Sequence, residues 1–242
     1  MLKLNQVQKT VCALAVLAAT SLPALAASSV DVRVIGTITP TACMPTLAGG
    51  GTIDYGVIHP NTLSDDAYTV LAEKQTTFSI VCDAPAKVAV QIVNQRVGSL
   101  AGSSNETSNG GTAPNGVTIF GTTASIGAAG LGLDGTSKIG GYGMRMVPGS
   151  FTIDDNTAVD GIYRNSAASD WILHAAGSTG SIFNVNTPRQ ISWAETGKTL
   201  PVAFTTLSGQ LGVQAYINKA SELDLTKPVS LDGLTTIELV YL

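Results

Sequence analysis

Charged residues are scarce in this chain. Lysine, arginine, aspartate and glutamate together make up 12% of its 242 residues, and the mean hydropathy is positive at +0.27. The surface of a soluble globular domain usually carries more charge than this. A chain with so few charged groups can hide much of its surface in contacts with other chains.

Basic residues are also fewer than acidic ones. Lys3 and Lys9 belong to a leader described below, so the 13 lysines and arginines are reduced to 11, against 17 aspartates and glutamates. The net charge without the leader is therefore −6. Because such a chain is repelled by nucleic acid and by anionic membranes, we expect neither as a partner.

Long apolar runs are missing except at the start of the chain. Residues 1–26 contain two lysines and no acidic residue, then the run VCALAVLAATSL, then PALA, with the small residues Ala24 and Ala26 before a cleavage point. The run is too short to span a bilayer, which takes about 20 residues. This pattern predicts a secretory signal peptide, cleaved after Ala26, and an exported chain.

Cysteine is nearly absent. Cys12 lies in the leader, which leaves Cys43 and Cys82. Two cysteines in an exported chain predict a disulfide bond, and two free buried thiols are the alternative. Closing a loop of about 40 residues would contribute roughly 4 kcal/mol to stability in the chain-entropy treatment.

A helical period of 3.6 residues is not sustained anywhere after the leader. Short apolar runs recur instead between turn signals, which predicts an all-β sandwich. The glycine-rich polar stretch 98–115 is predicted to be a long surface loop inside one domain, 41–242. The predicted strands are residues 52–58, 76–82, 87–93, 116–120, 142–147, 189–194, 200–207, 211–217 and 234–242.

Both ends of the exported chain are predicted to be apolar strands. The first is VDVRVIGTI, residues 30–38, and the last is residues 234–242. One side of the first strand carries Val30, Val32, Val34, Gly36 and Ile38. In the last strand Ile237, Leu239 and Tyr241 alternate with Glu238 and Val240. Chain ends usually fray unless a sheet holds them, so two such ends indicate that their pairing is the function.

Residues suited to catalysis are few, and we expect no enzyme. The two histidines are His59, in a predicted turn, and His174, four residues after Asp170. A Ser/His/Asp arrangement around His174 stays open, because triads form in space, but no G-x-S-x-G motif supports it. A secreted hydrolase is therefore an alternative function.

Three short motifs match ligand-binding patterns only by their letters. GLGLDG (130–135) has no following helix, so it predicts a turn-rich loop and no nucleotide site. DDNTAVDG (154–161) has the wrong spacing for a calcium loop and predicts a polar turn. NET (105–107) is a glycosylation sequon that matters only in a host that glycosylates exported chains. We expect no metal, cofactor or small-molecule substrate.

The two tryptophans are predicted to be core or strand-face residues. Trp171 and Trp193 would form a sugar platform only if both were exposed in one groove.

Four stretches carry a resemblance to a known family: VRVIGTITPTAC (32–43), GGGTIDYGVI (49–58), TTFSIVCDAP (76–85) and SLDGLTTIELVYL (230–242). Gly36 lies seven residues before Cys43, and Tyr241 is the penultimate residue. The chain resembles fimbrial subunits of the chaperone–usher pathway, and in particular their GltF-like subgroup in Gram-negative bacteria.

The resemblance implies a fold, an assembly mechanism and a set of partners. The fold would be an incomplete immunoglobulin-like β-sandwich, the pilin fold, lacking its last strand and preceded by a donor-strand extension, residues 27–40. A periplasmic chaperone and an outer-membrane usher would assemble the chain with neighbouring subunits into a fimbrium on the cell surface. A tip adhesin that binds carbohydrate is a further alternative.

The resemblance also assigns residues to this assembly. The donor strand, through Val30, Val32, Val34, Gly36 and Ile38, would fill a neighbour's groove. The edge beside which the chaperone strand pairs would consist of Ile237, Leu239, Tyr241 and Leu242. Pilins usually carry a glycine about fourteen residues from the end, whereas this chain has Val229 there and its nearest glycine is Gly233.

Overall fold

Two antiparallel sheets packed face to face form the body of the protein. The computed structural model describes residues 32–39, 41–122, 126–174 and 177–242, and the chain divides into two units, Met1–Thr39 and Pro40–Leu242. No α-helix occurs among the described residues, only three short 3₁₀ turns: Ala48–Gly51, Pro60–Thr62 and Ala220–Glu222. This confirms the predicted all-β class.

The first sheet is built around β14 (Phe204–Ile217). β14 pairs with β3 (Lys74–Ala86) on one side and with β9 (Gly140–Met146) on the other. β1 (Cys43–Leu47) pairs with β3 and forms one edge. Four short strands extend the sheet: β2 (Thr69–Val70), β5 (Gly111–Thr112), β6 (Gly127–Gly130) and β10 (Thr152–Ile153). β7 (Leu133–Asp134) and β8 (Ser137–Lys138) form a separate hairpin.

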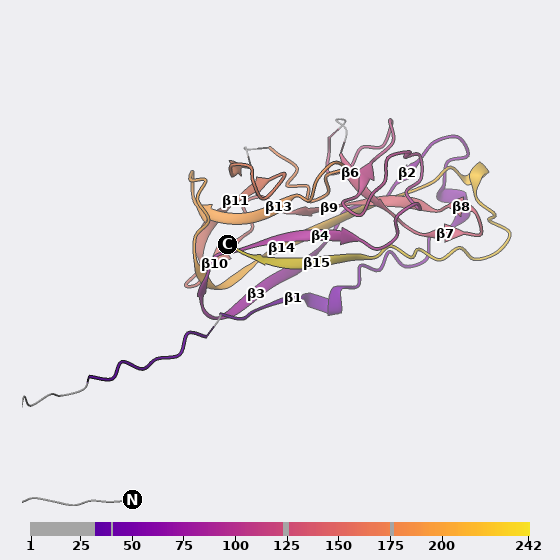
Figure 1. The fold of residues 1–242 in the computed structure, drawn as a ribbon. Helices are drawn as coiled ribbons and strands as arrows, with labels where there is room; N and C mark the ends of the chain where they lie inside the picture. The colour runs from indigo at the N-terminus through magenta and orange to yellow at the C-terminus, as the bar shows by residue number, and fades with distance from the viewer. Residues whose placement is uncertain (1–31, 40, 123–125, 175–176) are drawn as a thin grey trace, which may run out of the picture. The chain divides into compact units, whose positions relative to one another are not determined.

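The second sheet has the strand order β15–β4–β13–β11–β12. Its strands are β15 (Thr235–Tyr241), β4 (Val88–Asn94), β13 (Gln190–Glu195), β11 (Thr157–Arg164) and β12 (Ile172–Leu173). β10 pairs with both β11 and β14, so it links the two sheets. Figure 1 shows β15 beside β4 and β1 beside β3.

The core lies between the sheets and is centred on aromatic residues. Trp193 is fully buried, with its ring centroid 5.2 Å from that of Phe151 and 6.2 Å from that of Phe204. Inward-facing residues alternate along β3, where Phe78, Ile80 and Cys82 are buried. This alternation is what a sandwich requires of each strand, and the architecture is that of an incomplete immunoglobulin-like sandwich.

The disulfide bond joins two neighbouring strands. Cys43 and Cys82 are direct partners in the β1–β3 register, and their Cα atoms are 4.0 Å apart. The bond is formed, which confirms the predicted pairing and makes the free-thiol alternative wrong.

β14 corrects the predicted strands 200–207 and 211–217. The structure has one strand from Phe204, because the glycine at 209 lies inside the strand and does not break it. A Cβ atom at Gly209 would lie 2.3 Å from Cδ1 of Phe151, so the glycine allows the close approach of an aromatic ring. The predicted strand also began too early, at Leu200, just before Pro201.

Two other predicted strands are absent. Residues 52–58 carry no strand assignment, and residues 116–120 contribute only an isolated bridge between Ile119 and Thr122. Ile53 and Tyr55 are half-buried, which explains the period-two pattern without a ladder on that segment. β1 and β11 were not predicted, since Pro45 lies inside β1 and polar residues open β11. Proline is tolerated in β1 because β1 is an edge strand.

The predicted surface loop 98–115 is partly an interior segment. Leu100 and Ala101 are fully buried. The Glu106 carboxylate organises the loop by accepting hydrogen bonds from the backbone N–H groups of Gly98, Leu100 and Gly130 at 2.7, 2.8 and 3.0 Å. Buried backbone donors need such partners, and this single acidic side chain supplies several of them.

Candidate functional site

The core is open along one seam, between the two edge strands β15 and β1. Among the described residues, β15 pairs only with β4, and β1 pairs only with β3. An edge strand presents a row of unpaired N–H and C=O groups, which is a template for another strand. The seam is therefore the first place to look for a binding site.

Two adjoining cavities, of about 440 and 710 Å³, together form what we call the core groove. The smaller cavity lies at the seam, where Leu47 of β1 and Thr235 and Ile237 of β15 line it. The larger cavity adjoins it between the segments 52–63 and 223–231. The two cavities share Thr52, Ile53, Tyr55 and Leu231 in their linings. Most other lining side chains are apolar and come from β9, β14, β15 and residues 223–234. The apolar side chains of the two linings include Leu47, Ile58, Leu63, Met144, Leu211, Val213, Ile217, Leu223, Leu225, Val229 and Ile237.

One wall of the core groove is the extended segment 52–58. Its position is fixed by Tyr55, whose hydroxyl donates to the Val213 carbonyl oxygen and accepts from the Ala215 N–H, both at 3.1 Å. Burial raises the pKa of Tyr55, so the phenol stays neutral. Lys74 Nζ donates to the Asp54 carbonyl oxygen at 2.6 Å.

The opposite wall is β15 with the segment that leads into it. Ile237 lines the groove, and Leu239 packs against the core. Gly233 allows a close approach, because a Cβ atom there would lie 2.7 Å from Cε1 of Tyr142. Burial raises the pKa of Tyr142 to about 12. Val229, which stands where pilins usually carry a glycine, lines the groove.

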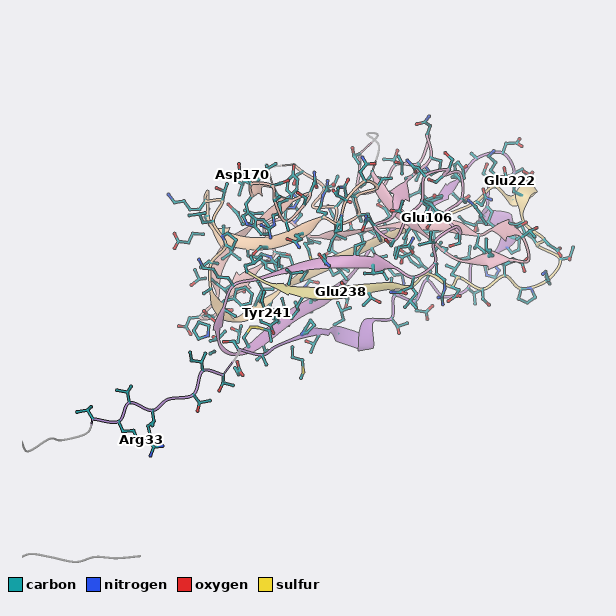
Figure 2. All side chains as sticks on the ribbon, viewed as in Figure 1. Arg33, Glu106, Asp170, Glu222, Glu238 and Tyr241 are labelled. Atoms are coloured by element: carbon teal, nitrogen blue, oxygen red, sulfur yellow. A yellow bond between two sulfur atoms is a disulfide. The ribbon has the colours of Figure 1, made fainter. Side chains whose placement is uncertain are left out.

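Tyr241 spans from β15 to β1 at the disulfide end of the seam. Tyr241 is labelled in Figure 2. Its hydroxyl accepts a hydrogen bond of 2.7 Å from the backbone N–H of Cys43. The side chain is half exposed. Leu242 follows, and its N–H donates to the Lys87 carbonyl oxygen at 3.0 Å. The predicted groove-edge residues Ile237, Leu239, Tyr241 and Leu242 thus all lie on β15 or directly after it.

The predicted donor-strand residues lie in the other unit. Val32, Val34, Gly36 and Ile38 are exposed, with Val34 at 92% and Ile38 at 100%, and residues 32–39 form no strand. This corrects the prediction of a strand over 30–38 for the single chain, since a strand needs a hydrogen-bonded neighbour. Val30 and the predicted signal peptide, 1–26, lie outside the described residues.

The two histidines, the candidates for a catalytic role, lie away from the core groove or at its margin. His59 is exposed and precedes the 3₁₀ turn Pro60–Thr62. His174 Nδ1 lies 3.2 Å from Ser178 Oγ, and its ring stacks on Tyr163 with centroids 4.7 Å apart. Burial, with the nearby Arg189 charge, lowers the pKa of His174 to about 4, so the ring is neutral at pH 7.

Each of the motifs 130–135 and 154–161 contains a turn. Residues 130–135 pass from β6 into the β7–β8 hairpin, with no helix after them. Asp154 lies in the turn between β10 and β11, where its carboxylate accepts from the backbone N–H groups of Thr205 and Thr206, both at 2.9 Å, and from the Thr205 hydroxyl. These bonds lower the pKa of Asp154. No cluster of metal-ligating side chains occurs among the described residues.

The condition for a tryptophan sugar platform, that both rings are exposed in one groove, is not met. Trp193 is buried in the core, and Trp171 is half-buried, with the Arg164 guanidinium 4.5 Å from its ring centroid. Within the described part of the chain, no helix combines the length and apolar character of a membrane span.

Comparison with known proteins places the chain near two relatives. It is 28% identical to Protein GltF of Escherichia coli (strain K12) over 99% of both chains, and 25% identical to Uncharacterized protein YhcF of the same organism over 88% of this chain and 90% of the relative. Residues 32–143 match a family described as Protein of unknown function (DUF1120). This supports the GltF-like part of the resemblance.

The residues that line the core groove were only partly predicted. Of these, the sequence pointed to Ile237 but not to the segment 223–231. Leu223 and Leu225, and then Val229 and Leu231, show the same period-two spacing on either side of Pro228. That spacing was the available signal for an extended apolar wall.

Proposed function

We propose that this chain is a structural subunit of a fimbria-like surface fibre, exported by residues 1–26 and assembled by donor-strand exchange. The observation that carries the proposal is the core groove beside the unpaired edge of β15. A strand added at a sheet edge gains affinity from main-chain hydrogen bonds and specificity from pockets for alternate side chains. The core groove offers both.

The donor is the segment around residues 30–38 of a neighbouring copy or a related subunit. Its alternate residues Val30, Val32, Val34 and Ile38 are apolar, and the described ones are exposed. Burying three valines and one isoleucine contributes roughly 1.5–3 kcal/mol each, or about 6–12 kcal/mol before ordering costs. Gly36 suits the position where a side chain would collide with the groove floor.

A periplasmic chaperone first fills the same groove, and an outer-membrane usher receives the complex. The low charge of the chain fits a protein that covers much of its surface with other subunits. In this account the chain has no catalytic role.

Gel electrophoresis without boiling tests assembly. Surface fractions from expressing cells should give a ladder of multimers that collapses to monomer on heating, because donor-strand contacts survive detergent. Val34→Asp should abolish the ladder, since an unpaired carboxylate would enter an apolar groove. Arg33→Ser, on the other face of the strand, is the matched control and should leave the ladder unchanged. The proposal would be contradicted if the unheated wild type ran only as a monomer, or if Val34→Asp and Arg33→Ser gave the same gel pattern.

A further inference from the structure

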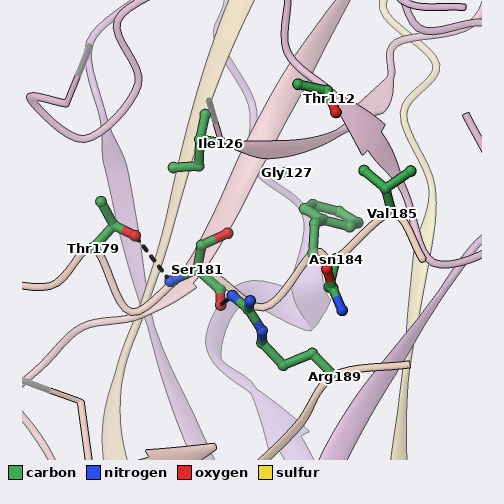
Figure 3. Close-up of a pocket in the computed structure, with 9 residues that line it drawn as sticks. Thr112, Ile126, Gly127, Thr179, Ser181, Asn184, Val185 and Arg189 are labelled. Atoms are coloured by element: carbon green, nitrogen blue, oxygen red, sulfur yellow. Dashed lines mark hydrogen bonds between the residues drawn. The ribbon is translucent and has the colours of Figure 1, made fainter. Parts of the chain in front are cut away.

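A second, polar pocket of about 200 Å³ lies away from the core groove and shares no lining residue with it. It is formed by β5, the start of β6, and the loop 179–189 that precedes β13 (Figure 3). Its apolar part comes from Ile126 and Phe183, both buried. Its polar part includes Thr112, Thr179, Ser181 and Arg189.

Ser181 brings an unpartnered hydroxyl to this pocket. The residue is only 5% exposed, and its Oγ has no hydrogen-bond partner among the described residues. In Figure 3 the hydroxyl points toward Gly127, which lines the pocket. Leaving a buried hydroxyl unsatisfied destabilises the fold, and a ligand that hydrogen-bonds to it recovers this cost.

Arg189 brings a positive charge without a carboxylate partner. Its Nε donates to Asn165 Oδ1 and its Nη1 to the Ser181 carbonyl oxygen, both at 2.9 Å, and its guanidinium lies 5.0 Å from the ring centroid of Tyr163. These contacts fix the orientation of the side chain. The ion pairs found among the described residues use other basic groups: Arg96, Arg145, Lys219 and Lys227.

The surroundings of Arg189 favour an anion. Burial lowers the pKa of Arg189, which reflects the cost of holding its charge away from water. A guanidinium pairs best with a planar carboxylate, to which it donates two hydrogen bonds. Thr179 Oγ1 accepts a 3.3 Å bond from the Ser181 N–H, which leaves its own hydroxyl proton available to a ligand in the pocket.

We propose that this pocket binds a small organic carboxylate of about the size of one sugar ring. The ligand carboxylate pairs with Arg189, and a hydroxyl or amide group of the ligand meets Ser181 Oγ. The volume is below that of ordinary drug-sized sites, so a longer ligand would present only its terminal unit. Two sources share this chemistry: an acidic sugar at the end of a glycan, and a free amino acid.

Isothermal titration of the mature protein tests the proposal with galacturonate, N-acetylneuraminate and glutamate, and with galactose as the neutral match for galacturonate. At least one acid should bind at least tenfold more tightly than galactose. Binding of galacturonate or N-acetylneuraminate without glutamate would identify a glycan source. Binding of glutamate without the acidic sugars would identify an amino-acid source. Binding of galactose as tight as that of galacturonate, or no binding by any of the three acids, would overturn the proposal.

Three variants separate the site from the fold. Arg189→Gln should reduce affinity for the acid at least tenfold, and Ser181→Ala should reduce it severalfold. Arg164→Gln is the matched control, because Arg164 lies on the neighbouring strand and contacts Trp171 and Gln190 outside the pocket. If Arg189→Gln fails to fold, the affinity of Ser181→Ala and the salt dependence of wild-type binding still test the proposal. Unchanged affinity in Ser181→Ala together with salt-independent binding would refute the proposal.

Discussion

At the scale of single residues, the glycine inside β14 shows how a close contact can be mistaken for a turn. Residue 209 lies inside the strand, and it is a glycine because the Phe151 ring occupies the space that a side chain would take. Gly209→Ala should therefore lower the free energy of unfolding by about 1–3 kcal/mol through overpacking. Urea titration measures this change. Ser208→Ala, one residue away and exposed, should change it by less than about 0.5 kcal/mol, and equal effects would contradict the packing argument.

His174 predicts a specific dependence of stability on pH. Its pKa is about 4 in the folded chain and 6.5 in a model peptide, so between these values the unfolded chain binds a proton that the folded chain does not. The contribution of neutral His174 to the free energy of unfolding is complete above pH 6.5 and is lost as the pH falls to about 4. The loss is at most roughly 3 kcal/mol.

The matched variant is His174→Gln. Several carboxylates with lowered pKa values, such as Asp154 and Asp232, also weaken the fold in acid. The variant keeps their contribution and removes that of His174. Its loss of stability between pH 6.5 and 4 should be smaller than that of the wild type, and equal losses in both would sink the assignment.

At the scale of elements, the disulfide bond secures an edge strand. β1 has only β3 as a neighbouring strand in the described structure, and Cys43–Cys82 joins the two directly. Replacing both cysteines by alanine should cost roughly 4 kcal/mol, the chain-entropy value for a loop of this length. Guanidinium unfolding of the purified variant measures the loss. A loss below about 1 kcal/mol would show that the sheet alone holds β1.

The strands that the sequence predicted best are β3, β4, β9, β13 and β15, which were found within a few residues. β3 and β15 bury alternate residues, whereas β4, β9 and β13 are buried along almost their whole length. Segment 52–58 has the same alternation but no ladder, since side chains alone hold it against β14. Periodicity reports which side chains are buried, and it does not report which backbone groups are paired.

The two candidate sites, the β15 edge and the polar pocket, also differ in how far the sequence predicts them. The strand β15 was predicted, because its apolar alternation is visible in the sequence, and its place at an edge was predicted from the family resemblance. The polar pocket was not, because Ser181 and Arg189 are brought to Thr112 only by the packing of distant strands. The role of Glu106 in the loop 98–115 was hidden for the same reason, since its donors include Gly130, far along the chain.

At the scale of the whole molecule, the central claim is that the open seam is a strand-binding groove. A chain whose groove is empty should be less stable than one whose groove is occupied. The most direct test joins a copy of SSVDVRVIGTITP after Leu242 through a short flexible turn and deletes residues 27–39. The copy can then fold back antiparallel to β15, and the intramolecular link removes the association cost.

Thermal unfolding of this grafted chain, followed by circular dichroism, decides the matter. Against the deletion alone, its midpoint should rise by at least about 10 °C, as expected for a gain of several kcal/mol in a chain of this size. Val34→Asp in the grafted copy should remove most of the rise, and Arg33→Ser should keep it. No rise in the midpoint, or the same rise with both substitutions, would contradict the account.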